Sequence, residues 1–222
     1  VVFKESAKYR AVPITKDGVK VNDPALAMKN GKGKKVVLWD FGAKANIRRE
    51  LLKRGVSVTT MPSSATAEEI IAQNPDGIML SNGPGDPAEN IGIIKELKKL
   101  CEKNIPLFGI CLGHQILALA RGAKTSKLKY GHRGANHPVK QLSTGRVYIS
   151  SQNHGYAVET ATLPKGAVLS FVNANDGTCE GINYIDIPAF SIQFHPEASG
   201  GPLDLNFLFD DFITLINKGS NK

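Results

Sequence analysis

The heptapeptide GICLGHQ, residues 109–115, places a cysteine between an apolar strand-like run and an apolar helix-like run. Glycines two residues before and two residues after Cys111 suit the sharp strand-to-helix turn that serves as a nucleophile elbow. At a helix N-terminus the helix dipole and the free N–H groups favour the thiolate, which is the form that attacks carbonyl carbons. The N–H of Leu112 can then stabilise an oxyanion. The turn alone leaves two interpretations open, a nucleophile or a buried apolar cysteine.

A base for such a nucleophile is present in FSIQFHPEAS, which follows the end of an expected strand. In an extended His-Pro-Glu segment, the side chains of His195 and Glu197 point to the same side, because side chains alternate with a period of two. The intervening proline stiffens the pair. A carboxylate that fixes the imidazole tautomer is the third member of a catalytic triad. Taken alone, the segment is also compatible with a surface turn.

A third loop, LSNGPGDP at 80–87, also follows an expected strand. Its two glycines and two prolines predict a rigid loop whose amide groups can face a ligand, with a plain surface β-turn as the alternative. Carboxyl ends of parallel strands share one edge of a sheet, so the three loops are expected to form one site.

Strands and helices alternate through the middle of the chain and predict the fold. Strands are expected at 35–40, 56–60, 76–81 and 105–110, and helices at 43–55, 65–73, 88–103 and 111–122. This alternation is typical of an α/β fold, a doubly wound, mostly parallel sheet with flanking helices. Shorter β-like segments after residue 123 predict an additional short β-rich section, and a final helix is expected at 203–217. Residues 1–33 have the composition of a linker or the remnant of an N-terminal domain, which leaves 34–222 as the main domain.

Charge is unevenly distributed along the 222 residues, whose formal net charge is +8. Residues 1–54 carry 14 Lys and Arg against 5 Asp and Glu, and the remainder is nearly neutral. This front part holds four aromatic residues, two of them in an expected strand, so it lacks the stacking platforms of a nucleic-acid reader. We interpret it as a solvated or partner-facing basic segment.

Several classes of protein are disfavoured by composition. No apolar run is long enough to cross a membrane. The three cysteines are odd in number and have no CxxC spacing, so we expect neither a disulfide scaffold nor a cysteine metal site. This cysteine content favours a cytoplasmic location. His132, His137 and His154 are expected in loops, and their 5- and 17-residue separations predict no metal site. His114 is interpreted as packing or hydrogen bonding near the elbow, and Cys101 and Cys179 as a helical and a strand thiol without catalytic neighbours.

Six segments together resemble one family, the class I (triad) glutamine amidotransferases. They are DFGAKANIRRELLKRG, LSNGPGDP, GICLGHQ, GANHPV, QNHGYAV and FHPEAS, spread over residues 35–217. DFGAKANI and GANHPV are more narrowly similar to the glutamine-hydrolysing small subunits of carbamoyl-phosphate synthases. The resemblance implies a flavodoxin-like fold and hydrolysis of L-glutamine through a glutamyl thioester. It also implies a large synthetase subunit that receives the ammonia and makes carbamoyl phosphate for pyrimidines and arginine.

The resemblance also implies roles for individual residues. Cys111 matches the nucleophile, His195 the acid/base and Glu197 its orienting partner. Seven positions match the glutamine-holding ones: Gly83, Gly85, Leu112, Gln115, Asn153, Gly155 and Tyr156. ATP, Mg²⁺ and bicarbonate would be used by the large subunit, so no cofactor is expected on this chain, and neither is a nucleic-acid or membrane partner.

One departure from the family pattern concerns the N-terminus. The family's small subunits carry a substantial N-terminal domain that lends a serine to the glutamine site, and here only residues 1–33 could be its remnant.

Two other interpretations remain, a non-catalytic docking domain on the same fold and a stand-alone cysteine hydrolase for γ-glutamyl or peptide substrates. The intact triad disfavours the first, and the carbamoyl-branch segments disfavour the second.

Overall fold

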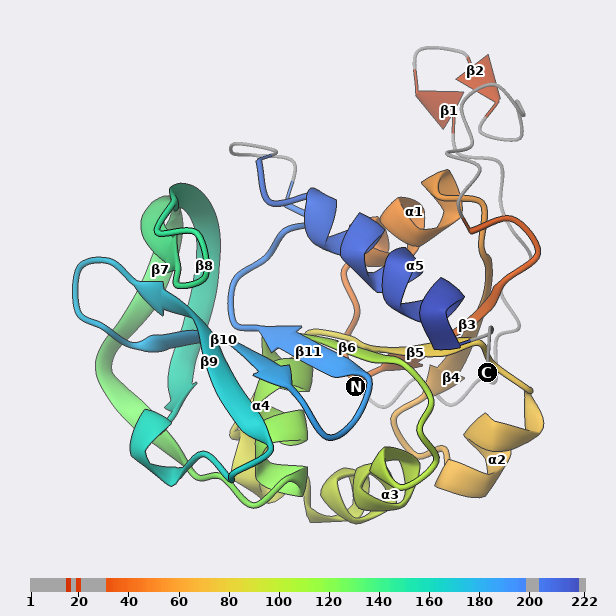
Figure 1. The fold of residues 1–222 in the computed structure, drawn as a ribbon, viewed down its shortest axis with the longest axis horizontal. Helices are drawn as coiled ribbons and strands as arrows, with labels where there is room; N and C mark the ends of the chain where they lie inside the picture. The colour runs from red at the N-terminus through yellow and green to blue at the C-terminus, as the bar shows by residue number, and fades with distance from the viewer. Residues whose placement is uncertain (1–14, 17–18, 21–30, 199–203, 220–222) are drawn as a thin grey trace.

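A nine-stranded sheet forms the centre of the computed structural model, which describes residues 15–16, 19–20, 31–198 and 204–219 (Figure 1). The strand order is β4-β3-β5-β6-β11-β10-β9-β7-β8. The first five run parallel, namely β4 (Ser57–Pro62), β3 (Lys35–Asp40), β5 (Gly77–Leu80), β6 (Leu107–Ile110) and β11 (Ala189–Ile192). The remaining pairings are antiparallel and add β10 (Cys179–Tyr184), β9 (Ala167–Asn173), β7 (Thr125–Gln141) and β8 (Val147–Val158). A separate two-stranded hairpin joins β1 (Thr15–Lys16) and β2 (Val19–Lys20).

Helices cover both faces of the parallel strands (Figure 1). Helices α1 (Ala45–Lys53) and α5 (Phe207–Gly219) lie on one face. Helices α2 (Ala67–Ala72), α3 (Ile91–Cys101) and α4 (Leu112–Ala120) lie on the other. Two short 3₁₀ turns, η2 (Pro87–Glu89) and η3 (Thr160–Thr162), complete the elements. Each face has its own apolar cluster, one that includes Trp39 and Leu117 and one that includes Phe108 and Phe209.

The local sequence explains why these elements form. All four residues of β5 and all four of β6 are buried, as expected for central parallel strands covered on both faces. Helix α2 begins with a capping box, in which Thr66 accepts from the Glu69 backbone N–H and the Glu69 carboxylate accepts from the Thr66 backbone N–H. Helix α4 is almost entirely buried, so the turn that precedes it is anchored deep in the core.

The predicted fold class is confirmed, with differences in the second half of the chain. Strands and helices up to residue 122 occur where the alternation placed them, with ends that shift by a few residues. The β-rich section continues the same sheet as four antiparallel strands, so half of the strand pairings are antiparallel. The final helix begins at Phe207, later than the predicted residue 203, and ends at Gly219.

Strand β7 is the largest difference, because it runs for 17 residues where the sequence predicts two short segments and a loop. Glycine and proline in GHRGANHP are typical of a turn. The structure instead places two register shifts in this stretch, and Gly131 and Gly134 have φ of 70° and 133°. The glycines therefore form bulges that bend a continuous strand.

Part of the basic front segment can be located. Most of the predicted linker, residues 1–33, lies outside the described residues. Lys34 forms an ion pair with Asp76 at 3.5 Å, and Asp76 also accepts from the backbone N–H of Lys35. Within the described part of the chain, no helix combines the length and apolar character needed to cross a membrane.

Candidate active site

Cys111 occupies the bend between β6 and α4 in a strained backbone conformation. Its φ is 53° and its ψ is −104°. Asn74 and Asn104 also have a positive φ, but the negative ψ of Cys111 places this residue outside the left-handed helical region. Such a conformation costs about 1–3 kcal/mol and persists only where the surroundings impose it. The bend predicted from the sequence is therefore confirmed, and the positive φ falls on the cysteine itself.

The two flanking glycines are required by close packing, not by their φ angles. A Cβ on Gly113 would lie 2.4 Å from the backbone oxygen of Leu80, and one on Gly109 would lie 2.8 Å from the oxygen of Gly113. Real Cβ atoms do not approach backbone so closely. Strand β6, helix α4 and the end of β5 can therefore meet at this elbow only because both positions lack side chains.

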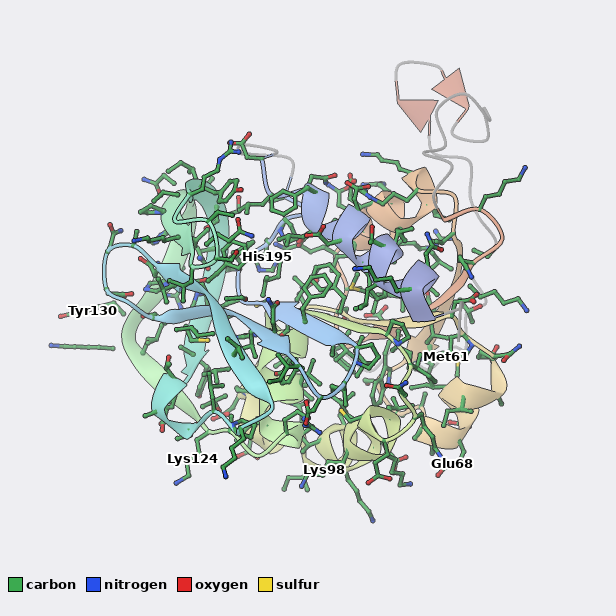
Figure 2. The ribbon with its side chains drawn as sticks, viewed as in Figure 1. Met61, Glu68, Lys98, Lys124, Tyr130 and His195 are labelled. Atoms are coloured by element: carbon green, nitrogen blue, oxygen red, sulfur yellow. The ribbon has the colours of Figure 1, made fainter. Side chains whose placement is uncertain are left out.

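Parallel pairing of β6 with β11 brings the predicted base next to the predicted nucleophile. Ile110 is in register with Ile192, and the Cys111 N–H donates to the Ile192 carbonyl at 2.9 Å. His195 follows β11 by three residues, and its own N–H donates to the carbonyl of Ser151. In Figure 2, His195 lies in the middle of the molecule, whereas Tyr130 and Lys124 lie at its outer edge.

His195 and Glu197 form a buried hydrogen-bonded pair, as the period of two predicted. Nδ1 of His195 lies 2.7 Å from Oε1 of Glu197. Burial alone would lower the pKa of His195, but hydrogen bonds with Cys111 and Glu197 raise that pKa to about 9. The imidazole is therefore charged at neutral pH, beside the sulfur whose anion it would stabilise.

Residues at the start of helix α1 also contact Glu197. Nζ of Lys44 lies 3.7 Å from Glu197 Oε1, and the Asn46 side-chain amide donates to the Glu197 backbone carbonyl at 3.0 Å. The segment DFGAKANI therefore contacts the predicted triad residue Glu197 through Lys44 and Asn46, which the sequence did not predict.

A cavity of about 430 Å³ opens beside Cys111 and His195. Six of the seven predicted glutamine-holding positions line it, namely Gly83, Gly85, Gln115, Asn153, Gly155 and Tyr156. The seventh, Leu112, does not line the cavity, and its side chain is buried in the apolar cluster beneath the elbow. Its backbone N–H still lies at the first position of α4, where a helix offers no internal acceptor.

Two predicted residues are held in place by the fold. Gln115 donates through Nε2 to the Tyr156 carbonyl and to Oε1 of Gln193, both at 2.8 Å, so its own side-chain oxygen is the atom left to accept. A Cβ on Gly83 would lie 2.4 Å from the Phe41 oxygen, so this position must be glycine for packing.

The rim of the cavity joins two distant segments. A hydrogen bond to Asp86 raises the pKa of the Tyr156 hydroxyl, which ties β8 to the loop after β5. This loop, LSNGPGDP, therefore lies at the same edge as the other two, as the sequence predicted.

Four polar cavity-lining side chains were not assigned to the site from the sequence: Lys44, Asn82, Arg133 and His154. Asn82 lies in the quoted loop, and its carbonyl oxygen accepts from the Lys44 N–H while its amide donates to the Gly42 carbonyl. The placement of His154 in a loop is wrong, because this residue lies on β8. Arg133 lies on β7, in register with Asn153. Only the pairing of β7 with β8 brings Arg133 and His154 to the cavity, so the local sequence does not predict their place there.

His114 and the other two thiols have structural surroundings. His114 is fully buried and hydrogen-bonds Ser191 on β11 at 2.8 Å, and burial lowers its pKa to about 3. Burial raises the pKa of Cys101 to about 11 and that of Cys179 to about 12, so both are poor thiolates. The placement of His132 and His137 in loops is also wrong, since both lie on β7.

Residues 37–215 match the family described as glutamine amidotransferase class-I. The chain belongs to the class I glutamine amidotransferase family. Within it, the chain is similar to proteins named carbamoyl phosphate synthase small chain. It is 50% identical over 219 residues to that of Bacillus caldolyticus, which covers 98% of this chain and 60% of the relative. It is 58% identical over 187 residues to that of Bacillus cereus, which covers 84% of this chain and 51% of the relative.

A third relative, the carbamoyl phosphate synthase small chain of Akkermansia muciniphila, is 55% identical over 181 residues, or 82% of this chain and 48% of its own. The chain thus spans about half the length of the relatives it matches. Two solved structures share the fold. A putative GMP synthase component from Thermoplasma acidophilum has a TM-score of 0.75 at 24% identity and covers 85% of this chain and 96% of its own. A glutamine amidotransferase from Thermotoga maritima has a TM-score of 0.59 at 20% identity.

Proposed function

We propose that this chain hydrolyses glutamine to glutamate and ammonia, with Cys111 as nucleophile, His195 as acid/base and Glu197 as its orienting partner. The observation that carries the proposal is that His195 contacts both Cys111 and Glu197, beside a cavity that Cys111 and His195 line. The other thiols of the described chain, Cys101 and Cys179, have neither a histidine partner nor this cavity.

The proposed reaction begins with attack of the Cys111 thiolate on the side-chain carbonyl carbon of glutamine. The N–H of Leu112 stabilises the oxyanion, because it is free of intrahelical bonding at the start of α4. His195 donates its Nε2 proton to the leaving nitrogen, which departs as ammonia and leaves a glutamyl thioester. Neutral His195 then takes a proton from water, which attacks the thioester and releases glutamate.

The rest of the cavity supplies recognition. The free side-chain oxygen of Gln115 can accept from the α-ammonium group of glutamine, because its amide nitrogen is already engaged. Backbone groups of Gly83, Gly85, Asn153 and Gly155, with the Tyr156 ring, can hold the rest of the amino-acid end. Cys111 would then meet the side-chain amide.

The ammonia is proposed to pass to a large synthetase subunit that makes carbamoyl phosphate from bicarbonate and ATP for pyrimidine and arginine biosynthesis. Support comes from relatives of 50–58% identity that are named carbamoyl phosphate synthase small chain. ATP and Mg²⁺ would bind the large subunit in a heterodimer, and the reducing cytosol suits a reactive thiol.

One experiment separates this proposal from its competitors. The chain, with and without a carbamoyl phosphate synthase large chain from a close relative, is incubated with radiolabelled glutamine, γ-glutamyl peptides and asparagine. Of the three substrates, we expect only glutamine to release glutamate, and we expect the large chain to stimulate this release. We also expect an acid-stable label on Cys111 that hydroxylamine removes as the hydroxamate. Faster turnover of γ-glutamyl peptides would favour a stand-alone hydrolase, and no turnover in any mixture would favour a docking domain.

A further inference from the structure

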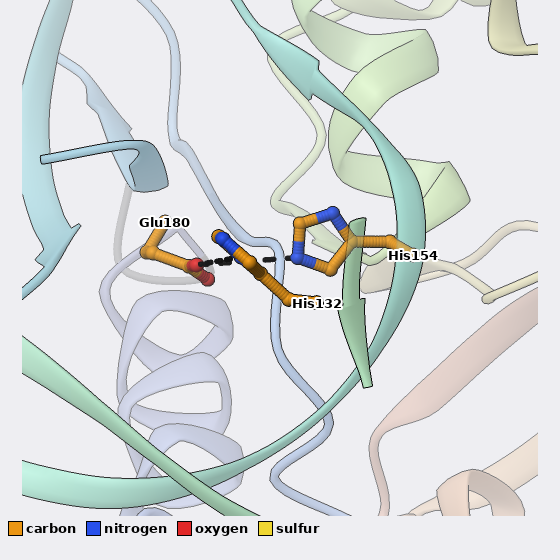
Figure 3. Close-up of side chains that lie close together, drawn as sticks. All are labelled: His132, His154 and Glu180. Atoms are coloured by element: carbon orange, nitrogen blue, oxygen red, sulfur yellow. Dashed lines mark ion pairs between the residues drawn. The ribbon is translucent and has the colours of Figure 1, made fainter. Parts of the chain in front are cut away.

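We propose that His132, His154 and Glu180 form a binding site for a divalent transition metal ion, with Zn²⁺ as the best-matched ion. The three side chains converge in Figure 3, and their ligand atoms all lie within 4.8 Å of one another. All three residues are buried, and the Glu180 side chain is fully so. The site is separate from the Cys111–His195 pair.

The sheet assembles this site from residues far apart in the sequence. His132 on β7 is in direct register with His154 on β8, so the two rings lie on one face of an antiparallel pair. Their centroids are 4.9 Å apart. Glu180 belongs to β10, two strands further along the sheet, and curvature of the antiparallel section brings it to the same place (Figure 1). The sequence separations predict no metal site, and the present proposal differs from that prediction because it rests on strand pairing and not on spacing.

His154 supplies the strongest indication that a cation belongs between these groups. Its Nδ1 lies 2.8 Å from the Tyr156 carbonyl oxygen, which can only accept, so Nδ1 carries the proton. In the neutral ring Nε2 is then a bare acceptor. This Nε2 is buried without a hydrogen-bond partner and lies 3.9 Å from Oε1 of Glu180, which is also an acceptor.

His132 faces the same carboxylate oxygen, but with a donor beside it. Its Nε2 lies 2.8 Å from Oδ2 of Asp176, so that nitrogen is a donor and Nδ1 faces Glu180 Oε1 at 3.3 Å. The Asn173 amide nitrogen lies 3.5 Å from His132 Nδ1 and 3.3 Å from Glu180 Oε1, so it can donate to either atom, and a proton on Nδ1 would also fill this gap. Neither the proton on His132 Nδ1 nor the Asn173 amide provides a donor between Glu180 and His154. One dication satisfies all three facing lone pairs at once.

The surroundings match the outer shell of a metal site. Metal-binding histidines usually donate their other ring nitrogen to a carboxylate or a backbone carbonyl. His132 faces Asp176, and His154 faces the Tyr156 carbonyl. The second carboxylate oxygen of Glu180 accepts from Gln152 Nε2 at 2.8 Å. The ligands are thus already oriented, with Nε2 of His154 unpartnered and Nδ1 of His132 shared only with the Asn173 amide at 3.5 Å.

The donor set selects the type of ion. Two imidazoles and one carboxylate are ligands for Zn²⁺, whereas Mg²⁺ and Ca²⁺ prefer oxygen ligands alone. Three protein ligands leave a fourth tetrahedral position open, as in sites that also bind water. His154 lines the glutamine cavity as well, so a bound ion would also fix the part of β8 that carries Asn153 and Tyr156.

The test begins in a Cys111→Ala variant, because Cys111 and His195 can themselves bind zinc. The metal-stripped variant is titrated with Zn²⁺ by calorimetry, and bound zinc is counted by elemental analysis after gel filtration. We expect one Zn²⁺ per chain with a micromolar or lower Kd. Binding is read directly in an inactive protein, so the result is independent of the proposed glutaminase.

Single substitutions then locate the ion. Glu180→Gln and His132→Gln in the same background are expected to weaken Zn²⁺ binding by at least about 100-fold, and Asp176→Asn by about 10-fold. The matched control is His137→Gln, which alters a neighbouring histidine of β7 whose ring nitrogen faces the Arg133 carbonyl. This control should bind Zn²⁺ as before. Equal loss in the control, or no loss in the first two variants, would overturn the proposal.

Cobalt keeps the proposal testable if a substituted chain does not fold. Co²⁺ bound to the Cys111→Ala chain should show visible d–d bands typical of nitrogen and oxygen ligands. A sulfur-to-cobalt charge-transfer band would place the ion on Cys101 or Cys179 and overturn the assignment. Failure of the folded Cys111→Ala chain to bind either ion would overturn it equally.

Discussion

Nδ1 of His195 lies 2.7 Å from Oε1 of Glu197, and both side chains are buried. Because a carboxylate only accepts, Nδ1 holds a proton, and Nε2 is the atom that faces Cys111. The tautomer that can serve the sulfur is thus fixed by Glu197. This relationship ranks the effects expected when each member of the proposed triad is changed.

Replacing Cys111 with serine should lower glutamine hydrolysis by at least about 1,000-fold, because an alkoxide forms far less readily than a thiolate beside one imidazole. In a complex with the proposed large subunit, synthesis of carbamoyl phosphate from free ammonia should survive. Steady-state assays with both nitrogen sources measure the difference. Cys101→Ser serves as the control and should keep its glutaminase activity. Glutamine-dependent activity in Cys111→Ser would exclude Cys111 as the nucleophile.

His195→Asn should be nearly as damaging as loss of the nucleophile, and Glu197→Gln much less so. Proton transfer by a positioned side chain contributes roughly 100- to 10,000-fold in rate, while an orienting partner acts only through it. The kcat for glutamine should therefore fall in the order wild type, Glu197→Gln, His195→Asn, while the KM values stay similar. If the two variants are equally inactive, Glu197 does more than orient the ring.

Stability should fall as pH rises through the titration of His195. Burial favours the neutral ring, yet hydrogen bonds with Cys111 and Glu197 raise the pKa of His195 to about 9, above the value of about 6.5 in unfolded chains. The native state therefore binds more protons than the unfolded state between these values. This contribution, roughly 3 kcal/mol, is complete below about pH 6.5 and is lost by about pH 9. Urea unfolding from pH 6 to 9.5 should show this slope in the wild type and lack it in His195→Asn.

Gly113→Ala should disrupt the elbow, because its new Cβ would lie 2.4 Å from the Leu80 backbone oxygen. Overpacking of this kind costs about 1–3 kcal/mol, and the displaced Cys111 should lose most of its glutaminase activity. Gly92→Ala is the matched control, since its Cβ meets nothing within 4 Å on helix α3. Denaturation midpoints and activities of the two variants should diverge, and a fully active Gly113→Ala enzyme would contradict the packing argument.

The basic front segment is expected to speed association with the proposed large subunit. Lys34 pairs with Asp76, so neutralising Lys32, Lys34 and Lys35 also removes one local ion pair. The triple variant should associate more slowly than wild type at low salt, with the difference shrinking as salt screens the charges. Stopped-flow association at two ionic strengths measures this.

A second triple variant and a nucleic-acid assay complete that experiment. Neutralising Lys95, Lys98 and Lys103 changes the net charge equally from helix α3 and its end, and should affect association less. The glutaminase activity of both variants should be unchanged. Micromolar binding of a random RNA or DNA duplex at physiological salt, lost in the first variant, would show that this segment serves nucleic acid instead.

The amino-acid sequence by itself determined the elements in the first half of the molecule and the sheet edge at which the candidate active site lies. Short apolar runs that end in glycine-rich turns define β5 and β6, and both strands are buried on two faces as such runs require. Strand ends in a parallel sheet share one edge, which is why Cys111, His195 and the loop at 80–87 could be placed together before any contact was known.

Only the tertiary structure decided what the antiparallel section does. Glycine and proline in residues 131–138 predict a turn, yet pairing with β8 holds this stretch in one bulged strand. Strand register is a property of the partner strand as much as of the sequence. The pairing of His132 with His154, and the arrival of Glu180 beside them, therefore carry no local signal. The reason that Gly109 and Gly113 must be glycine likewise depends on what packs against them, namely the backbone of α4 and of β5.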